Sequence, residues 1–274
     1  MNKINFAFFG TPDVASETLE ILKENGYLPS LIITAPDKPQ GRKMLITPPP
    51  AKVWAEKNNI PYLQPNEVRS DLFEYLRSHL PSPDLFIVVA YGKILPEEII
   101  NLPKFGSINI HYSLLPKYRG ASPVESAILN GDTETGITIQ KMQFKMDSGP
   151  IIAQEKVTIL PDEKAPDLRK RLIKIGGELL VKILPDFVDE KIKPILQNEN
   201  ETTFCKKIKK EDGLIDLNDD PVKNYNKFRA YAAWPRTFFF KDGKRIIITD
   251  AKLENGEFKT LKIIPEGKKE IDYK

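Results

Sequence analysis

The chain has 274 residues, 41% of them hydrophobic and 29% charged, which is typical of one large or two modest globular domains and excludes a disordered chain. A single cysteine, Cys205, excludes an intramolecular disulfide, and two histidines exclude an all-histidine metal site. No run of about 18 apolar residues predicts a membrane span, and residues 1–6 lack the pattern of a signal peptide. We therefore expect a cytoplasmic protein without a membrane partner.

The formal net charge is +3, and the basic excess lies near the C-terminus. Residues 201–274 contain 17 Lys and Arg against 13 Asp and Glu. Such an excess points only weakly to a polyanionic partner such as nucleic acid, and an ordinary solvated surface is the better explanation of the charge alone.

Apolar runs alternate with amphipathic segments over the first two thirds of the chain. The runs predict strands at residues 4–9, 28–34, 85–90, 106–110, 135–142 and 151–159. Helical periodicity predicts helices at residues 14–22, 51–59, 68–80, 96–102, 122–130 and 165–191, and the polar segment 35–50 predicts a long loop. This alternation predicts an α/β domain with a Rossmann-like, mostly parallel sheet over residues 1–190.

The remaining residues predict a linker and a second, smaller domain. Residues 191–210 are polar without clear periodicity, which is typical of a linker. Beyond them, a helical stretch at 222–232 and short apolar runs at 237–240, 245–249, 258–260 and 261–264 indicate a small β-rich domain over residues 211–274.

Three predicted strands end in segments that should meet. Parallel strands carry their ligands beyond their carboxyl ends, where residues 10–12, 90–92 and 109–111 are expected to converge. The first of these segments reads Gly-Thr-Pro-Asp and lacks the glycine spacing of a dinucleotide-binding turn, and no phosphate-binding P-loop is present. NAD and ATP are therefore poor candidates for the ligand.

Asn109 and His111 are the first candidate catalytic pair. At a strand end, residues i and i+2 point to the same side, so both side chains should face one cleft. An amide can donate to a developing oxyanion, and an imidazole can transfer a proton near neutral pH. Asp147 is a candidate for the carboxylate that would complete the set. Taken alone, His111 also fits a structural histidine and Asp147 a turn former, and spacing does not bring them together.

A longer motif follows this pair. Asn109, His111, Ser113–Pro116, Arg119, Gly120, Asp147 and Gly149 resemble the signature of the 10-formyltetrahydrofolate-dependent formyltransferases. Further similar stretches include Phe9–Pro12, Pro36–Pro39, Val89–Pro96, Gly136–Thr138, Lys207–Asp216 and Trp234-Pro235, so the resemblance spans essentially the whole chain. The C-terminal part is shorter than is usual in the family by about 30–40 residues after Ala251, which leaves open how complete its barrel is.

The resemblance implies a fold and an activity. It implies a Rossmann-like catalytic domain, a shortened β-barrel-like (OB-type) second domain, and formyl transfer from 10-formyltetrahydrofolate to the α-amine of methionyl initiator tRNA without a metal, by a chain that acts as a monomer. It implies catalytic roles for Asn109, His111 and Asp147.

The same resemblance implies binding residues. The folate contacts would be Tyr91, Gly92, Ser113, Leu114, Leu115 and Pro116, and the tRNA contacts Arg42, Lys43, Lys206, Lys207, Lys209 and Lys210. Without the resemblance, Leu114–Pro116 would fit a buried loop and residues 35–50 a solvated one.

Three other functions are open at this point. A sugar-nucleotide N-formyltransferase can share the Asn-His-Asp set, but the basic segment at Arg42, the Arg119-Gly120 context and the second-domain motifs argue against it. A formylfolate hydrolase usually carries a different N-terminal regulatory domain. A catalytically idle RNA-binding protein does not need the intact set of Asn109, His111 and Asp147.

Overall fold

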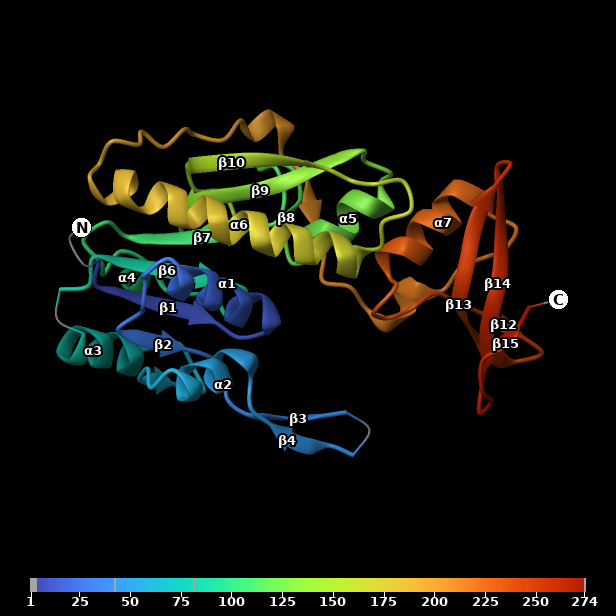
Figure 1. Cartoon of the computed structure of the whole chain (residues 1–274), viewed down its shortest axis with the longest axis horizontal. Helices are drawn as coiled ribbons and strands as arrows, with labels where there is room; N and C mark the ends of the chain where they lie inside the picture. The colour runs from blue at the N-terminus through green and yellow to red at the C-terminus, as the bar shows by residue number, and fades with distance from the viewer. Residues whose placement is uncertain (1–3, 42, 81, 274) are drawn as a thin grey trace. The chain divides into compact units, whose positions relative to one another are not determined.

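The computed structural model describes residues 4–41, 43–80 and 82–273, without the side chains of Gln40 and Ser70. Its contacts divide the chain into two units, each assembled from separate stretches (Figure 1). The first unit contains residues 1–111, 137–155 and 173–200, and the second contains residues 112–136, 156–172 and 201–274.

The first unit is built on a seven-stranded sheet. Its strands, in spatial order, are β10 (Ile151–Thr158), β9 (Glu134–Lys141), β7 (Ser107–His111), β6 (Leu85–Val89), β1 (Phe6–Gly10), β2 (Leu31–Ile33) and β5 (Tyr62–Leu63). The pairs from β7 to β5 are parallel, and β9 runs antiparallel to β7. Strands β1 and β6 are apolar and buried along their whole length because both faces of the sheet are covered. The predicted mostly parallel α/β architecture is confirmed.

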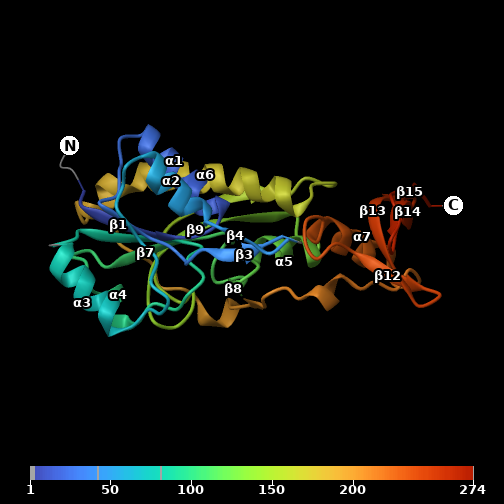
Figure 2. The ribbon, with the colours of Figure 1, turned by 90° about the horizontal axis from the view of Figure 1, so that it is seen from below.

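Helices cover the two faces of this sheet (Figure 2). On one face lie α1 (Asp13–Glu24) and the C-terminal half of α6 (Ala165–Val188), where Gly177 packs directly against Ile21. On the other face lie α3 (Ser70–His79) and α4 (Glu97–Ile100). The leucines of α3 and the isoleucines of α4 form one buried cluster with Ala7, Phe9, Phe86, Val88 and Tyr91. The apolar spacing of α3 therefore buries one helix face, as its sequence predicts.

Two expectations about individual elements were wrong. Segment 35–50 is not an irregular loop, because it contains the hairpin of β3 (Lys38–Gln40) and β4 (Leu45–Thr47) before α2 (Pro50–Lys57). The runs at 258–260 and 261–264 are one strand, β14 (Glu257–Pro265), which pairs along its length with β13 (Lys244–Glu254). The first segment shows no regular alternation because its apolar side chains Leu45 and Ile46 are both exposed, and in the second the polar residues Lys259, Thr260 and Lys262 interrupt the apolar run of β14.

The second unit combines two helices with small sheets. Helix α5 (Pro123–Leu129) contacts α7 (Pro221–Ala230), and β8 (Arg119–Gly120) pairs with β11 (Phe204–Cys205). An antiparallel sheet follows in the order β12 (Phe238–Lys241), β13, β14 and β15 (Ile271–Asp272). Its inner face packs on α7 through Tyr225 and Phe228. A small β-rich C-terminal part is thus confirmed.

Candidate active site

The carboxyl ends of three neighbouring strands align at one edge of the first unit's sheet. The register pairs Gly10 with Val89 and Val88 with Asn109, so β1, β6 and β7 end side by side. The hydroxyl of Thr11 donates to the carbonyl oxygen of Tyr91 over 3.0 Å, which ties the first of the following segments to the second. The predicted convergence is confirmed.

Asn109 and His111 lie on the same face of β7, two residues apart. The side chain of His111 is 6% exposed. Asn109 is aligned with Val88 of β6, which belongs to the apolar cluster with Phe9 and Tyr91. Asn109 and His111 therefore lie on the same face of the sheet as that cluster. A polar pair thus interrupts a face that is apolar over the neighbouring strands.

Strand β9 continues this polar surface. Its register places Gln140 opposite Asn109 and Thr138 opposite His111, so all four side chains share one face of the sheet. Gln140 is 2% exposed and Thr138 is fully buried, and the hydroxyl of Thr138 accepts from the side-chain amide of Gln154 over 2.8 Å. Buried polar groups are held in hydrogen bonds because an unmade bond costs about 1–3 kcal/mol. The β7–β9 face is therefore a preformed polar surface.

Asp147 reaches this surface from the loop between β9 and β10. Its carboxylate Oδ1 lies 3.6 Å from Nδ1 of His111 and accepts a hydrogen bond from Nε2 of Gln140 over 3.0 Å. The Asp147 side chain is 14% exposed. Its backbone is left-handed at φ 50°, a conformation that Asp tolerates better than most residues. The structure thus brings together the two residues that spacing alone does not connect.

A clamp holds this loop over the sheet. Because β9 is antiparallel to β7, the loop that follows β9 leaves the sheet beside the start of β7. There the backbone N–H of Met142 donates to the carbonyl of Ser107. The loop must then fold back along β7 to bring Asp147 to His111. The amide Nε2 of Gln197 donates to the carbonyl oxygens of Asp147 (2.8 Å) and Gly149 (2.7 Å).

Gly149 makes this return possible by its lack of a side chain. A Cβ at this position would lie 1.7 Å from the carbonyl oxygen of Lys141, so no other residue fits without moving the loop. The backbone of the Asp147 loop thus passes directly against the end of strand β9 at Gly149.

The chemistry available at this face is that of proton transfer and oxyanion binding. An amide donor, an imidazole and a carboxylate lie in one unit on adjoining segments. Among the residues that the structure describes, no group of three or more His, Cys, Asp or Glu could hold a metal ion. The amide, the imidazole and the carboxylate are groups that suit acyl transfer, which needs oxyanion binding and proton transfer.

The predicted folate residues differ in exposure. Tyr91 is 3% exposed, and its ring packs edge-on against Phe9 with centroids 5.5 Å apart. Burial raises the pKa of the Tyr91 hydroxyl to about 12, and this hydroxyl has no hydrogen-bond partner in the described part of the chain. Gly92 is exposed at φ 81°. The Tyr91 side chain thus belongs to the core, and the backbone of the Tyr91-Gly92 turn is what remains for a ligand.

The segment from Ser113 to Pro116 is compact. The Ser113 hydroxyl is fully buried and donates to the carbonyl of Lys117 over 2.6 Å, which closes a short turn. Leu115 is 3% exposed, while Leu114 and Pro116 are half-buried.

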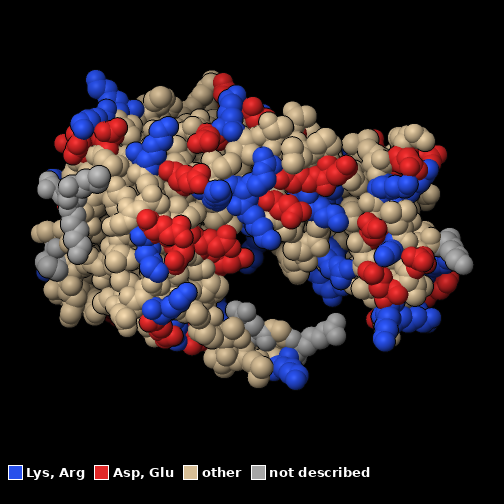
Figure 3. Space-filling model, in the orientation of Figure 1, with Lys and Arg blue, Asp and Glu red and all other residues tan. Residues whose placement is uncertain are grey.

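The predicted tRNA contacts lie on exposed surfaces. Arg42 lies outside the described residues. Lys43 is exposed beside three exposed apolar side chains of the hairpin, Met44, Leu45 and Ile46. Lys206, Lys207, Lys209 and Lys210 are also exposed. On the face drawn in Figure 3, basic and acidic side chains are interspersed, and no continuous basic patch is visible there.

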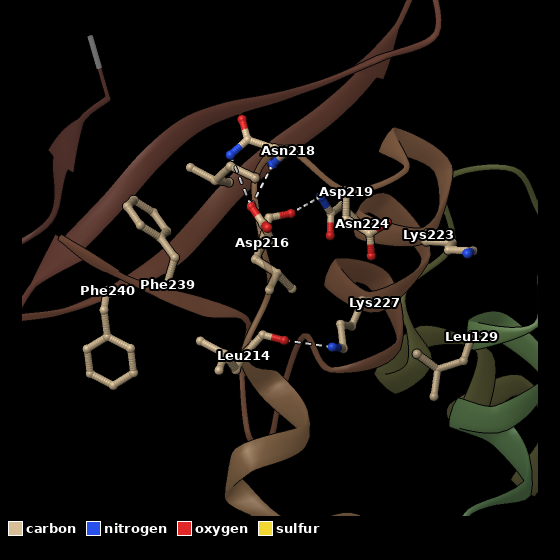
Figure 4. A pocket seen from close by; sticks show the side chains of 12 residues that line it. Leu129, Leu214, Asp216, Asn218, Asp219, Lys223, Asn224, Lys227, Phe239 and Phe240 are labelled. Carbon is tan, nitrogen blue, oxygen red and sulfur yellow. Dashed lines mark hydrogen bonds between the residues drawn. The ribbon is translucent and has the colours of Figure 1, made fainter.

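The second unit contains a large pocket that holds none of the predicted site residues (Figure 4). Its volume is about 720 Å³, and it lies between the segment 214–219, α7 and β12, with Leu129 of α5 at its margin. Lys227 donates to the carbonyl of Leu214 over 2.6 Å, and Asp216 accepts from the backbone and the side chain of Asn218. Several of its polar groups thus bond to one another, and none of the proposed catalytic residues lines it.

Sequence reasoning missed Thr138, Gln140 and Gln197. In β9 the order Ile137, Thr138, Ile139, Gln140 alternates apolar and polar residues, a pattern that indicates one polar face on a buried strand. That signal could have paired Gln140 with Asn109. Gln197 lies in the predicted linker, and no local pattern identifies it.

Comparison with known proteins identifies the family of the chain. Residues 2–184 match the formyl transferase family and residues 207–272 match the formyl transferase C-terminal domain. The chain is 40% identical to the methionyl-tRNA formyltransferase of Caldicellulosiruptor saccharolyticus over 93% of this chain and 82% of that protein. It is 42% identical to the enzyme of the same name from Thermotoga maritima over 85% of this chain and 74% of that protein.

Solved structures share the fold at lower identity. The N-formyltransferase from Helicobacter canadensis, in complex with folinic acid and dTDP-3-aminofucose, aligns with a TM-score of 0.70 at 21% identity over 92% of this chain and 88% of its own. Methionyl-tRNA formyltransferase from Clostridium thermocellum aligns with a TM-score of 0.62 at 18% identity over 98% of this chain and 100% of its own. The chain belongs to the formyl transferase family, as the sequence motif predicted. No helix among the described residues is long and apolar enough to cross a membrane.

Proposed function

We propose that this chain transfers a formyl group from 10-formyltetrahydrofolate to the α-amine of methionyl initiator tRNA. The observation that carries the chemistry is the 3.6 Å approach of His111 and Asp147 beside Asn109 on one polar face. The choice of acceptor is supported by relatives that are 38–42% identical over most of their length and are named methionyl-tRNA formyltransferase.

Asn109 and His111 act on the oxygen of the formyl group. The amine nitrogen bonds to the formyl carbon, and the bond from that carbon to N10 of the folate breaks. The amine loses one proton and N10 gains one, so the overall reaction is balanced. While the carbon is tetrahedral its oxygen is negative, and the amide of Asn109 and an imidazolium at His111 stabilise it. Removing one such donor typically lowers the rate about 10²–10³-fold.

Asp147 assists the proton transfer. Its carboxylate, 3.6 Å from Nδ1 of His111, stabilises the imidazolium and accepts a proton from the attacking amine, directly or through a water molecule. General base catalysis of this kind is worth roughly 10²–10⁴-fold. Gln140 and Gln197 are positioning residues in this scheme, because the first holds the carboxylate and the second holds the loop that carries it.

The folate binds along the segments that follow β6 and β7. Backbone groups of Tyr91 and Gly92 and of the turn from Ser113 to Pro116 hold the flat ring. The side chains of Ser113 and Leu115 are buried and stiffen the turn, which leaves its backbone groups to contact the folate.

The hairpin and the lysine cluster contact RNA. Lys43, with Arg42, contacts the nucleic acid from the hairpin, and Lys206, Lys207, Lys209 and Lys210 contact phosphates, which makes the affinity salt-dependent. In this scheme residues 1–190 form the catalytic domain, 191–210 the connection, and 211–274 the tRNA-binding domain of a monomer.

The test offers two acceptors at once. The protein is mixed with 10-formyltetrahydrofolate and an equimolar pair of methionyl initiator tRNA and a 3-amino sugar nucleotide, and both products are quantified. We expect formyl-methionyl-tRNA with little formylated sugar. Formylation of the sugar alone would replace the proposal with the sugar-nucleotide alternative, whose fold is shared by the Helicobacter canadensis enzyme.

A further inference from the structure

A second, smaller pocket in the second unit combines an exposed indole with cationic groups. Its volume is about 250 Å³, and the side chains that matter to its chemistry are Ser122, Glu125, Arg169, Lys207 and Trp234. The sequence motifs singled out Lys207 and the pair Trp234-Pro235, yet formyl transfer gives Trp234 no role.

Trp234 is unusual for a tryptophan because 56% of it is exposed. The other tryptophan, Trp54, is 6% exposed, and its indole Nε1 donates to the carboxylate of Glu20 over 2.6 Å. A large aromatic ring left open at a pocket offers a flat surface on which a nucleobase can stack. The small apolar side chains of Ala230 and Ala233 line the same pocket and leave room beside the ring.

The charges of the pocket suit one phosphate. Arg169 forms an ion pair with Glu125, whose side chain is 10% exposed, so these two charges cancel. Lys207 lines the pocket from an exposed position and adds a positive charge. Ala165 and Pro166, the first residues of α6, also line it and present the positive end of a 24-residue helix. The buried Ser122 also lines the pocket and adds a hydroxyl.

We propose that this pocket binds an unpaired nucleotide of the RNA substrate, with its base on the Trp234 ring and its phosphate beside Lys207. The inference rests on the proposed function, because it assumes that the acceptor is an RNA. It goes further by naming a base-stacking site where the sequence indicated only phosphate contacts. An unpaired nucleotide is required because a base within a duplex has no free face for the ring.

Fluorescence gives a direct reading of this contact. In a Trp54→Phe variant, Trp234 is the sole tryptophan, and its emission is followed while deacylated initiator tRNA is added. We expect saturable quenching by the tRNA and none by a blunt RNA duplex of similar length. Unchanged emission at saturating tRNA, or equal quenching by the blunt duplex, would overturn the proposal. If Trp54→Phe does not fold, the wild type serves with iodide as quencher, because iodide reaches the exposed Trp234 and not Trp54, and bound tRNA should protect Trp234.

Affinity measurements separate stacking from charge. Trp234→Ala should weaken tRNA binding on the order of 10-fold or more, Trp234→Phe should retain most of the affinity, and neither should alter the slope of log affinity against log salt. Lys207→Gln should instead reduce that slope by about one. Phe240→Ala is the matched control, since Phe240 is 57% exposed in the same unit and lies outside this pocket. Equal affinity of Trp234→Ala and Phe240→Ala would contradict the inference.

The same samples distinguish the two levels of the account. If the wild type formylates methionyl-tRNA and Trp234→Ala binds the tRNA as the wild type does, only the pocket assignment fails. If the wild type neither binds initiator tRNA nor formylates its methionine, the proposed function fails, and the pocket proposal fails with it.

Discussion

Two loops of the first unit carry proposed functional residues, and they are built in opposite ways. The loop with Asp147 is held by Gln140 and Gln197 and pressed against the backbone at Gly149. The β3–β4 hairpin leaves the side chains of Met44, Leu45 and Ile46 each 64–67% exposed. The difference teaches that a group acting on a reacting atom is fixed before the substrate arrives, whereas a group that grips a large partner stays on the surface.

Gly149→Ala tests the clamp most severely. The added Cβ would meet the Lys141 carbonyl at 1.7 Å, so the loop must shift and Asp147 must leave His111. We expect kcat to fall roughly 10²–10⁴-fold, the contribution of a positioned proton acceptor, with little change in tRNA affinity. Steady-state formylation and filter binding measure the two quantities. An unaltered kcat would show that the close approach is unimportant.

Gln140→Leu removes one bond from Asp147 and keeps the volume of the side chain. Because Gln140 touches no substrate in this scheme, we expect kcat to fall about 10-fold, with the pH–rate profile displaced and the KM for tRNA unchanged. Gln140→Asn or Gln140→His, which retain a donor, should recover part of the rate. A lower stability with an unmoved pH profile would reduce Gln140 to a structural residue.

A substitution in the hairpin should change the affinity for tRNA and leave kcat unchanged. Lys43 is exposed, so Lys43→Gln removes a phosphate contact without disturbing packing. The slope of log affinity for tRNA against log salt should decrease by about one, with kcat at saturating tRNA preserved. The surface lysine Lys174 on α6 provides the matched control, Lys174→Gln. A salt slope that is the same in both variants would remove Lys43 from the interface.

Tyr91→Phe is expected to change stability only at high pH and to leave the KM for the folate unchanged, as suits a side chain of the core. Burial raises the pKa of Tyr91 to about 12, so the protonated form is favoured in the folded state. The contribution of the protonated Tyr91 hydroxyl to the free energy of unfolding is complete below about pH 10. It is lost as the pH rises to 12, because the unfolded chain releases the proton first. Tyr91→Phe should therefore unfold less readily than the wild type at pH 11, by about 1.4 kcal/mol, and be equal or slightly more stable at pH 7.

Denaturant titrations at pH 7 and pH 11 measure this difference. The KM for 10-formyltetrahydrofolate should stay the same, since only the backbone of Tyr91 is assigned to the folate. A large rise in that KM would mean that the hydroxyl contacts the ligand.

The sequence predicts the sheet and its catalytic edge for a physical reason. Buried parallel strands such as 85–89 are continuous apolar runs, and strands that alternate with helices are typical of a mostly parallel sheet with right-handed crossovers. Asn109 and His111 were assigned to one face by their spacing alone, and the structure bears this out. Asp147 joined them only through the family motif, because its approach depends on a loop that folds back over the sheet.

The remainder depends on contacts that have no local signature. Gln197 is more than 80 residues from His111 in a segment without periodicity, yet it holds the carbonyls of the Asp147 loop. The hairpin at 38–47 has exposed side chains on both sides, so no alternation distinguishes it from an irregular loop. Local propensity cannot identify Gln197, because its hydrogen bonds join residues about 50 positions apart in the sequence.

The most direct test of the central claim is the single-turnover rate of formyl transfer to methionyl initiator tRNA in Asp147→Asn, with both substrates saturating. We expect a rate roughly 10²–10⁴-fold below the wild type, with the affinity for tRNA retained, because the amide keeps the shape of the carboxylate and loses its proton-accepting charge. A rate within a few-fold of the wild type would contradict it, since His111 would then act without the carboxylate that lies beside it.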